Sequence, residues 1–309
     1  MTGAAISRLD DVALEKLLGS KAVSRRNAKN CGGASNFKGG RYEEFFGAHR
    51  VARLARKLIA NQEDALVEWQ SDCFVDDFVV RRDHNNSFKG YQLKNSPAVS
   101  WGSPDEGIAS DFALQQNLSA AEGYVDIRLR LVCSNQSTVN NLTNTLPSSI
   151  SSWSRASFFP YEERLLHLFN ANPWLAEDFG FLSKHERPTK MDVEQVATIM
   201  MGAWSAKAPT ALVSEVVEQA RNASPTIVRA FGSDADAMTK LQPVFKGILD
   251  QLPDFEYEIK RGFLRWRAMG KTMSGVLSYD CFRAEFAKLQ SHIISMQPTS
   301  FQDIEGVLV

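Results

Sequence analysis

Residues 75–95 read VDDFVVRRDHNNSFKGYQLKN, two apolar runs separated by a polar turn. This pattern predicts two strands of a β-hairpin. Two adjacent acids, Asp76 and Asp77, stand at the head of the first run, and the second run contains Gln92 and Lys94 two positions apart. Residues two apart on a strand share a face, so Gln92 and Lys94 should point the same way. We therefore expect the hairpin to bring a carboxylate, an amide and an ammonium group together.

The sequence around the hairpin predicts an α/β core. Apolar residues at 3.6-residue spacing, with arginines on the other faces, indicate a long helix before the hairpin. The predicted order is helix, three strands, helix and strand, over residues 41–62, 65–70, 73–80, 88–95, 106–121 and 124–134.

The rest of the chain divides into further segments by composition. An N-terminal helix and loop are expected at 1–37, before the α/β core at 38–135. Residues 136–157 are rich in Ser, Asn and Thr and are interpreted as a linker or long loop. Residues 158–309 have mainly helical patterns, which we interpret as a partner-binding or regulatory region.

Composition narrows the class of protein. The 309 residues are 44% hydrophobic with a net charge of −1, as in an ordinary globular protein that does not coat nucleic acid indiscriminately. No apolar run reaches membrane-spanning length and the N-terminus lacks a signal-peptide pattern, so a cytoplasmic location without membrane contact is expected. Four scattered cysteines without a CxxC pair indicate neither a zinc site nor a disulfide framework, and we expect Cys73 and Cys133 to be buried.

Convergence of these polar groups suits phosphodiester hydrolysis. Oxygen ligands hold Mg²⁺, and a lysine stabilises the charge that develops on a phosphate. A further acid is available on the long helix, at Glu43 or Glu44. Projection at about 100° per residue puts Glu44 in the apolar stripe with Val51 and Ala55. A carboxylate there is costly unless it is paired or bound to metal, which favours Glu44 as the residue facing the sheet.

These residues resemble the PD-(D/E)xK nuclease superfamily in its QxK variant, with a restriction-endonuclease-like αβββαβ core. More narrowly, DDFVV and GYQLKN preceded by GGRYEEFF look like the double-stranded DNA nuclease domain of bacterial anti-phage effectors of the CBASS and Lamassu types. The resemblance covers about residues 38–135. An acid followed by an apolar run, as in that family, favours Asp77 over Asp76.

The resemblance implies Mg²⁺-dependent DNA cleavage, with Mn²⁺ able to substitute. Asp77, Glu44, Gln92 and the Leu93 carbonyl would hold the metal, and Lys94 would stabilise the transition state. It also implies a cytoplasmic defence nuclease controlled by a partner, such as a sensor or an SMC-like ATPase, or by homo-oligomerisation. Gln92 stands where relatives often have an acid, so the number of metals stays open.

Basic residues in two parts of the chain are candidates for DNA contact. Two groups are expected to meet phosphates, one flanking the hairpin and one in the aromatic-containing stretch 258–271. The hairpin group could instead belong to a solvated turn that binds nothing. The stretch 258–271 could instead be a basic amphipathic segment with buried aromatic residues. The candidates are Arg81, Arg82, Lys89, Lys260, Arg261 and Arg265.

Two other functions fit the same residues. A sequence-specific restriction endonuclease would use the same site and would cut DNA into discrete bands. A non-catalytic interaction protein would keep the core only as a scaffold. Cleavage assays separate the three functions.

Overall fold

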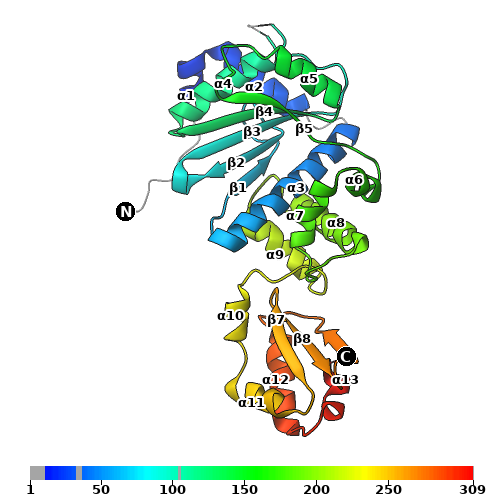
Figure 1. Ribbon diagram of the computed structural model, residues 1–309. Coiled ribbons are helices and arrows are strands. Elements are labelled where there is room, and N and C mark those ends of the chain that lie inside the picture. Colours follow the sequence, from blue (N-terminus) through cyan, green and yellow to red (C-terminus); the bar gives the residue numbers. More distant parts are fainter. Residues whose placement is uncertain (1–10, 33–36, 104–105, 309) are drawn as a thin grey trace.

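The computed structural model describes residues 11–32, 37–103 and 106–308. It is a mixed α/β structure with a six-stranded mixed sheet and a separate three-stranded antiparallel sheet (Figure 1). The main unit has helices α1 Asp11–Leu18, α2 Ser20–Gly32, α3 Phe37–Asn61, α4 Ile108–Ala121, α5 Gln136–Asn144, α6 Leu165–Ala171, α7 Pro173–Phe181, α8 Lys190–Lys207 and α9 Val213–Ala223. Its strands are β1 Leu66–Trp69, β2 Phe78–Arg82, β3 Ser87–Lys94, β4 Asp126–Cys133, β5 Ser154–Phe158 and β6 Thr210–Leu212.

The large sheet has the order β5-β4-β3-β2-β1-β6. Strands β1, β2 and β3 form an antiparallel meander, whereas β3, β4 and β5 run parallel. A parallel pair needs a crossover, which α4 provides between β3 and β4 and α5 provides between β4 and β5. The predicted succession from the long helix to the fourth strand is confirmed as α3-β1-β2-β3-α4-β4.

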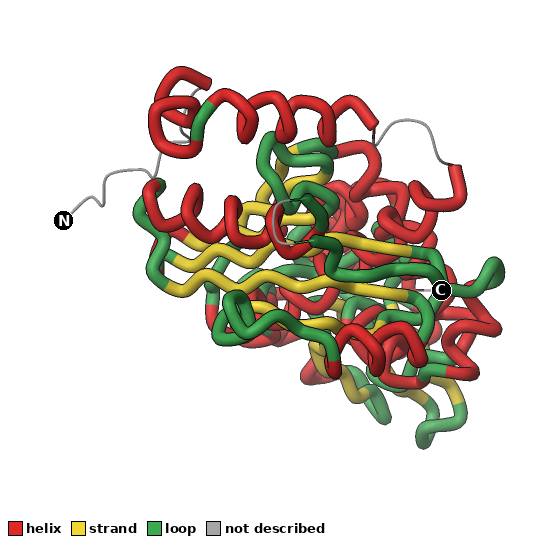
Figure 2. Tube along the Cα trace, turned by 90° about the horizontal axis from the view of Figure 1, so that it is seen from above, coloured by secondary structure: helices red, strands yellow, loops and turns green. Residues whose placement is uncertain are grey.

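Helices cover both faces of this sheet (Figures 1 and 2). Phe78 and Val80 of β2 belong to the core shared with α3, α7, α8 and α9. Val79, between them, belongs to the opposite core shared with α1, α2, α4 and α5. Because alternate side chains enter different cores, all five residues of β2 are buried.

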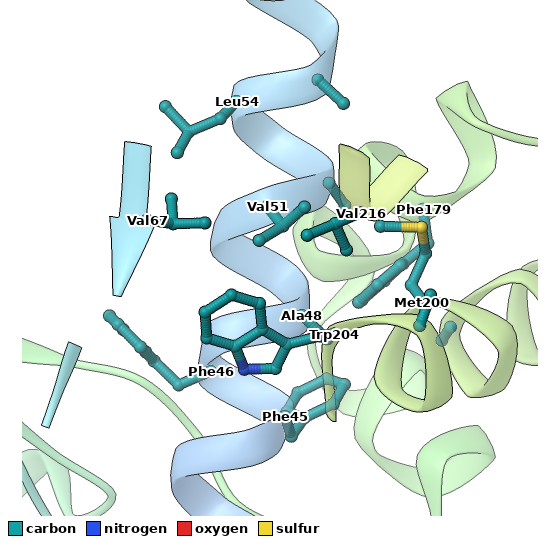
Figure 3. Packing of buried hydrophobic residues seen from close by; sticks show 14 of the residues in the cluster. Phe45, Phe46, Ala48, Val51, Leu54, Val67, Phe179, Met200, Trp204 and Val216 are labelled. Carbon is teal, nitrogen blue, oxygen red and sulfur yellow. The ribbon is translucent and has the colours of Figure 1, made fainter. Parts of the chain in front are cut away.

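Helix α3 is buried on two sides. Phe46 packs on Phe78 and Tyr91 of the sheet, whereas Phe45 packs on Phe179 of α7. The fully buried Trp204 of α8 lies against α3 (Figure 3), where a Cβ on Gly47 would collide with its indole. The small residue lets the two helices approach closely, so α3 sits between the sheet and a helical layer.

The predicted linker at 136–157 is wrong. Residues 136–144 form α5, and the strand β5 begins at Ser154. The side chain of Asn135 accepts a hydrogen bond from the Thr138 N–H, which caps α5 in a segment whose composition suggests a loop. β5 then pairs in parallel with β4, so this segment completes the sheet.

The C-terminal half is less helical than the sequence pattern predicts. β6 joins the large sheet beside β1, and the α8 and α9 side chains share the α3 core. A second unit follows (Figure 1), in which the basic stretch of 258–271 forms part of an antiparallel sheet. It consists of α10 Asp234–Met238, α11 Pro243–Gln251, β7 Glu256–Lys260, β8 Phe263–Ala268, β9 Met273–Val276, α12 Ala284–Met296 and α13 Glu305–Leu308.

Cys73 and Cys133 are buried, as predicted, with 1% and 0% of their surface exposed. Cys31 lies outside the residues whose side chains are described. Across the described chain, no helix combines the length and the apolar character needed to cross a membrane.

Candidate functional site

The polar centre of the hairpin is Asp77. Its Oδ2 accepts one hydrogen bond from Gln92 Nε2 at 2.6 Å and another from the backbone N–H of Leu93 at 2.6 Å. Phe78 pairs with Tyr91 in the register of β2 and β3, which brings Asp77 opposite Gln92. Asp77 is 7% exposed and Gln92 2%, so both polar groups are held at a buried position beside the sheet.

The segment before Asp77 is a bend, whereas the sequence predicts a strand from residue 73. The backbone N–H groups of Phe74 and Val75 donate to the side-chain oxygen of Gln115 on α4, at 2.8 and 3.2 Å. The N–H of Ser71 donates to the carbonyl of Asp76. These bonds satisfy the backbone outside the sheet, so β2 begins only at Phe78. Asp77 is therefore the last residue before β2 and points at β3.

Lys94 is at the end of β3 that is nearest Asp77. Gln92 is in register with Leu131 and Lys94 with Cys133, and both of these partners belong to the core on the α4 side. Tyr91 belongs to the opposite core, on the α3 side. The predicted shared face of Gln92 and Lys94 is therefore confirmed. Lys94 is half-buried where the strand leaves the sheet.

Glu43 of α3 reaches the same end of the sheet. Its Oε2 accepts hydrogen bonds from Trp69 Nε1 at 3.2 Å and from Gln70 Nε2 at 2.8 Å. Burial and the negative charge of Asp77 raise the pKa of Glu43 to about 7, although the two hydrogen bonds and Lys94 oppose this shift. The influence of Asp77 and Lys94 on this pKa means that all three charges lie within electrostatic reach of one another.

Glu44 lies elsewhere, which corrects the expectation that it faces the sheet. Its Oε1 accepts a hydrogen bond from Ser205 Oγ of α8 at 2.5 Å. Helical projection does place Glu44 on a buried side of α3, but that side packs on α8. Glu43 shares the sheet-facing side with Phe46, three residues later. Because α3 has two buried sides, its apolar stripe alone does not identify the one that meets the sheet.

Asp76, next to Asp77, is a buried acid that acts on Cys73. It is 3% exposed, and its charge contributes to raising the pKa of the Cys73 thiol to about 12, after the larger effect of burial. The preference for Asp77 over Asp76 as the residue beside Gln92 is therefore consistent with the hydrogen bonds. Trp69 and Gln70, which hold Glu43, were not identified from the sequence, because their contact depends on how α3 crosses β1.

The group fits an oxygen-ligated divalent cation. Within the described residues, no three His, Cys, Asp or Glu side chains lie close enough to bind a metal by themselves. Asp77 and Glu43 supply two carboxylates, and their mutual repulsion is what a cation relieves. Rotation of the Gln92 amide by half a turn replaces its NH₂ with its oxygen, which gives a third ligand. Mg²⁺ retains several waters and needs few protein ligands.

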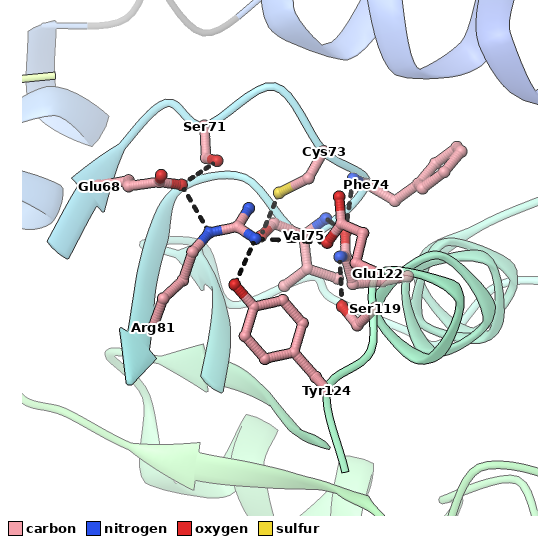
Figure 4. A network of polar contacts seen from close by, with 10 residues as sticks. Glu68, Ser71, Cys73, Phe74, Val75, Arg81, Ser119, Glu122 and Tyr124 are labelled. Atoms are coloured by element: carbon pink, nitrogen blue, oxygen red, sulfur yellow. Dashed lines mark hydrogen bonds and ion pairs between the residues drawn. The ribbon is translucent and has the colours of Figure 1, made fainter. Parts of the chain in front are cut away.

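Arg81 does not face solvent, so its predicted contact with DNA is corrected. Its side chain is 6% exposed and lies 3.3 Å from a carboxylate oxygen of Glu68 and 3.3 Å from one of Glu122 (Figure 4). It also donates to the Tyr124 hydroxyl at 3.2 Å. Burial opposes the charge of Arg81, but Glu68, Tyr124 and Glu122 together raise its pKa above the ordinary value. Arg81 therefore neutralises two buried acids.

The C-terminal basic residues also differ in their surroundings. Arg261 Nη1 donates to the backbone carbonyls of Gly180, Ser183 and His185 at 2.7–3.0 Å, which ties the second unit to the main one. Arg265 lies 3.3 Å from a carboxylate oxygen of Glu186 and donates to the Lys184 carbonyl.

The predicted DNA contacts of Arg261 and Arg265 therefore compete with these internal bonds, whereas Lys260 is half-buried at the end of β7. Arg82 and Lys89 lie together on the α3 side of the sheet, at a cavity away from Asp77.

Comparisons of the chain with protein-family models, with curated proteins and with solved structures gave no match. Asp77, Gln92, Lys94 and Glu43 are the sequence-predicted or newly found polar residues that the fold brings to one end of the sheet. That arrangement places two carboxylates, an amide and a lysine at one end of the sheet.

Proposed function

We propose that the protein is a divalent-metal-dependent nuclease that hydrolyses DNA phosphodiester bonds. The observation that carries this proposal is the placement of Asp77, Gln92 and Lys94 on one face of a hairpin, with the half-buried Glu43 of α3 beside them. Two acids, an amide and a lysine at one end of a mixed sheet form the donor set that phosphoryl transfer requires. The αβββαβ order and the QxK spacing support assignment to a PD-(D/E)xK-type core.

The residues have separate roles in this proposal. Asp77, Glu43 and Gln92 would hold Mg²⁺ or Mn²⁺, with the Leu93 carbonyl as a further candidate. When bound, the cation polarises the scissile phosphate and lowers the pKa of its bound water. Lys94 places a positive charge where the phosphate gains negative charge. The hydrogen bonds from Trp69 and Gln70 orient Glu43, and the Leu93 N–H orients Asp77.

Titration of Glu43 gives this site a dependence on pH. With a pKa of about 7, Glu43 is largely protonated in mildly acidic solution and offers no charge to a cation. Cation binding therefore competes with one proton on the Glu43 carboxylate. We expect affinity for Mg²⁺ to increase as the pH rises through about 7.

Cleavage of linear and circular DNA in Mg²⁺, with EDTA as the negative control, tests this function. Lys94→Ala should reduce the cleavage rate by about a hundredfold or more, with an unchanged circular dichroism spectrum. Glu43→Gln should also lose cleavage, whereas Glu44→Gln, the same change one residue later, should retain it. Wild-type cleavage by Lys94→Ala would contradict the assignment.

A controlling partner is part of this proposal. A nuclease that cuts any DNA endangers its own cell, so an anti-phage role requires a regulatory complex or oligomerisation. The assay should therefore include the products of neighbouring genes. Discrete bands would favour a restriction endonuclease, whereas no cleavage together with a stable large complex would favour an interaction protein.

A further inference from the structure

A strongly basic cavity of about 320 Å³ lies between α3 and strands β2–β5. It is on the α3 side of the sheet, where Tyr91 and Val132 form part of its wall, whereas Gln92 and Lys94 face the α4 side. Helix α3 contributes Arg50, Arg53 and Lys57. The strands contribute Arg82, Lys89, Arg130 and Arg155.

These seven cations have no acidic partner in the cavity. No Asp or Glu of the described residues lines it, and none of the seven is in an ion pair within the described part of the chain. With a net charge of −1 for the whole chain, this is a local concentration of positive charge. Seven like charges around one small cavity repel each other and are stabilised by a multiply charged anion.

Two of the arginines are built into the cavity wall. Arg82 is 8% exposed, and the Nε atoms of Arg50 and Arg82 are buried without a hydrogen-bond partner in the described structure. Burial, Arg82, Arg50 and Lys57 lower the pKa of Lys89, and Asp126 only partly opposes them. An unpaired buried donor is costly. A phosphate oxygen in the cavity would accept from these groups.

Aromatic side chains complete the cavity. Trp174 is 40% exposed at the rim, whereas Tyr91 and Phe159 are each 3% exposed within the wall. Arg50 Nη2 donates to the Tyr91 hydroxyl at 2.7 Å, and its guanidinium lies over the Tyr91 ring. Aromatic faces stack on nucleobases, and guanidinium groups bind phosphates bidentately. A volume of about 320 Å³ is at the lower end of the range for small-molecule sites. Trp174 at the rim therefore offers a surface for a base, and the arginines offer places for phosphates.

We propose that this cavity binds a free nucleotide that carries two or more phosphate groups. A DNA duplex is the competing ligand, since it also presents phosphates. Its rigid backbone would reach the exposed Arg53 and Arg155 at the rim, but not the buried Arg82. A neighbouring recess of about 510 Å³ shares Lys89, Arg130 and Arg155 and is also lined by the ion pair of Asp126 and Arg128. The proposal does not depend on the nuclease function.

Isothermal titration calorimetry of the full chain with ATP, in EDTA, tests the proposal. Saturable binding of ATP is expected. The exposed pair Arg53→Glu and Arg155→Glu, combined in one variant, should weaken it about tenfold or more. Arg53→Glu alone should also weaken binding, and Arg41→Glu is its matched control, because it makes the same single charge reversal on an exposed residue of α3 that does not line the cavity. ATP affinity of this control should stay near the wild-type value.

Absence of saturable ATP binding would overturn the proposal, as would an equal loss of affinity in Arg41→Glu. Displacement of ATP by a short DNA duplex at lower concentration than by ADP would also overturn it. Inorganic tripolyphosphate should bind more weakly than ATP, since it lacks a base. Equal affinity for the two would refute a nucleotide site, because the aromatic wall would then contribute nothing.

Discussion

Replacement of Glu43 by glutamine should make the protein more stable at alkaline pH in the absence of metal. Glu43 has an ordinary pKa near 4.5 when unfolded and about 7 when folded. Between these values the folded protein binds a proton that the unfolded chain has lost, so the free energy of unfolding decreases as the pH rises. The contribution of the protonated carboxyl is complete at acidic pH and is lost by a pH above about 7.

The size of this effect follows from the pKa difference. At full burial, a rise from 4.5 to about 7 corresponds to roughly 3 kcal/mol. The side chain is partly exposed, and solvent screening reduces this to about 1–2 kcal/mol. Glutamine keeps a carbonyl oxygen that can accept from Trp69 and Gln70, and it removes the repulsion with Asp77. The loss of stability with rising pH should therefore be absent in Glu43→Gln.

Urea denaturation at about pH 5 and about pH 8, in EDTA, measures the difference. The difference in unfolding free energy between Glu43→Gln and the wild type should be about 1–2 kcal/mol more favourable to the variant at about pH 8 than at about pH 5. Glu44→Gln, beside Ser205 of α8, should keep the wild-type pH dependence. Mg²⁺ should stabilise the wild type at alkaline pH and have less effect on Glu43→Gln. The reasoning is refuted if the wild type and Glu43→Gln show the same pH dependence.

Two further predictions concern the packing that positions the site. Arg81→Met removes the guanidinium that lies 3.3 Å from the buried acids Glu68 and Glu122 and should cost about 3–5 kcal/mol of unfolding free energy, measured by urea denaturation. An unchanged stability would mean that the two acids find other partners. Gly47→Ala forces a methyl group into the indole packed on α3 and should cost about 1–3 kcal/mol. Gly40→Ala on the same helix meets no atom within 4 Å and should instead gain about 0.5–1 kcal/mol in the same measurement; equal effects of the two changes would contradict close packing at Gly47.

Local sequence patterns were sufficient to predict the hairpin and the shared face of Gln92 and Lys94. The period of two in a strand puts Gln92 and Lys94 on one face whatever surrounds them, and the register of β3 with β4 agrees. The polar turn between the apolar runs likewise predicts that the segment of Asp77 returns beside Gln92. These are short-range consequences of backbone geometry, which the sequence encodes directly.

The identity of the helical acid required the three-dimensional packing. Glu43 and Glu44 are adjacent in the sequence, and about 100° of helical rotation separates them. One side of α3 meets the sheet and another meets α8, and both are apolar. The pattern that makes α3 a buried helix therefore does not distinguish the site from the helix–helix contact.

Composition also gives wrong predictions of secondary structure and exposure where contacts between distant residues decide them. The Ser- and Asn-rich stretch at 136–157 contains α5 and the start of β5 because β4 offers an open edge for parallel pairing. Arg81 and Arg82 are adjacent and equally basic in the sequence, yet Arg81 neutralises Glu68 and Glu122 whereas Arg82 lines the cavity.

By itself, the sequence determined the order of the core elements and the side chains that share one strand face, because both depend on contacts between near neighbours along the chain. Only the tertiary structure decided which acid lies near Asp77 and which arginines line the basic cavity. Those outcomes depend on how α3 crosses the sheet, and that crossing is set by packing among residues far apart in the sequence.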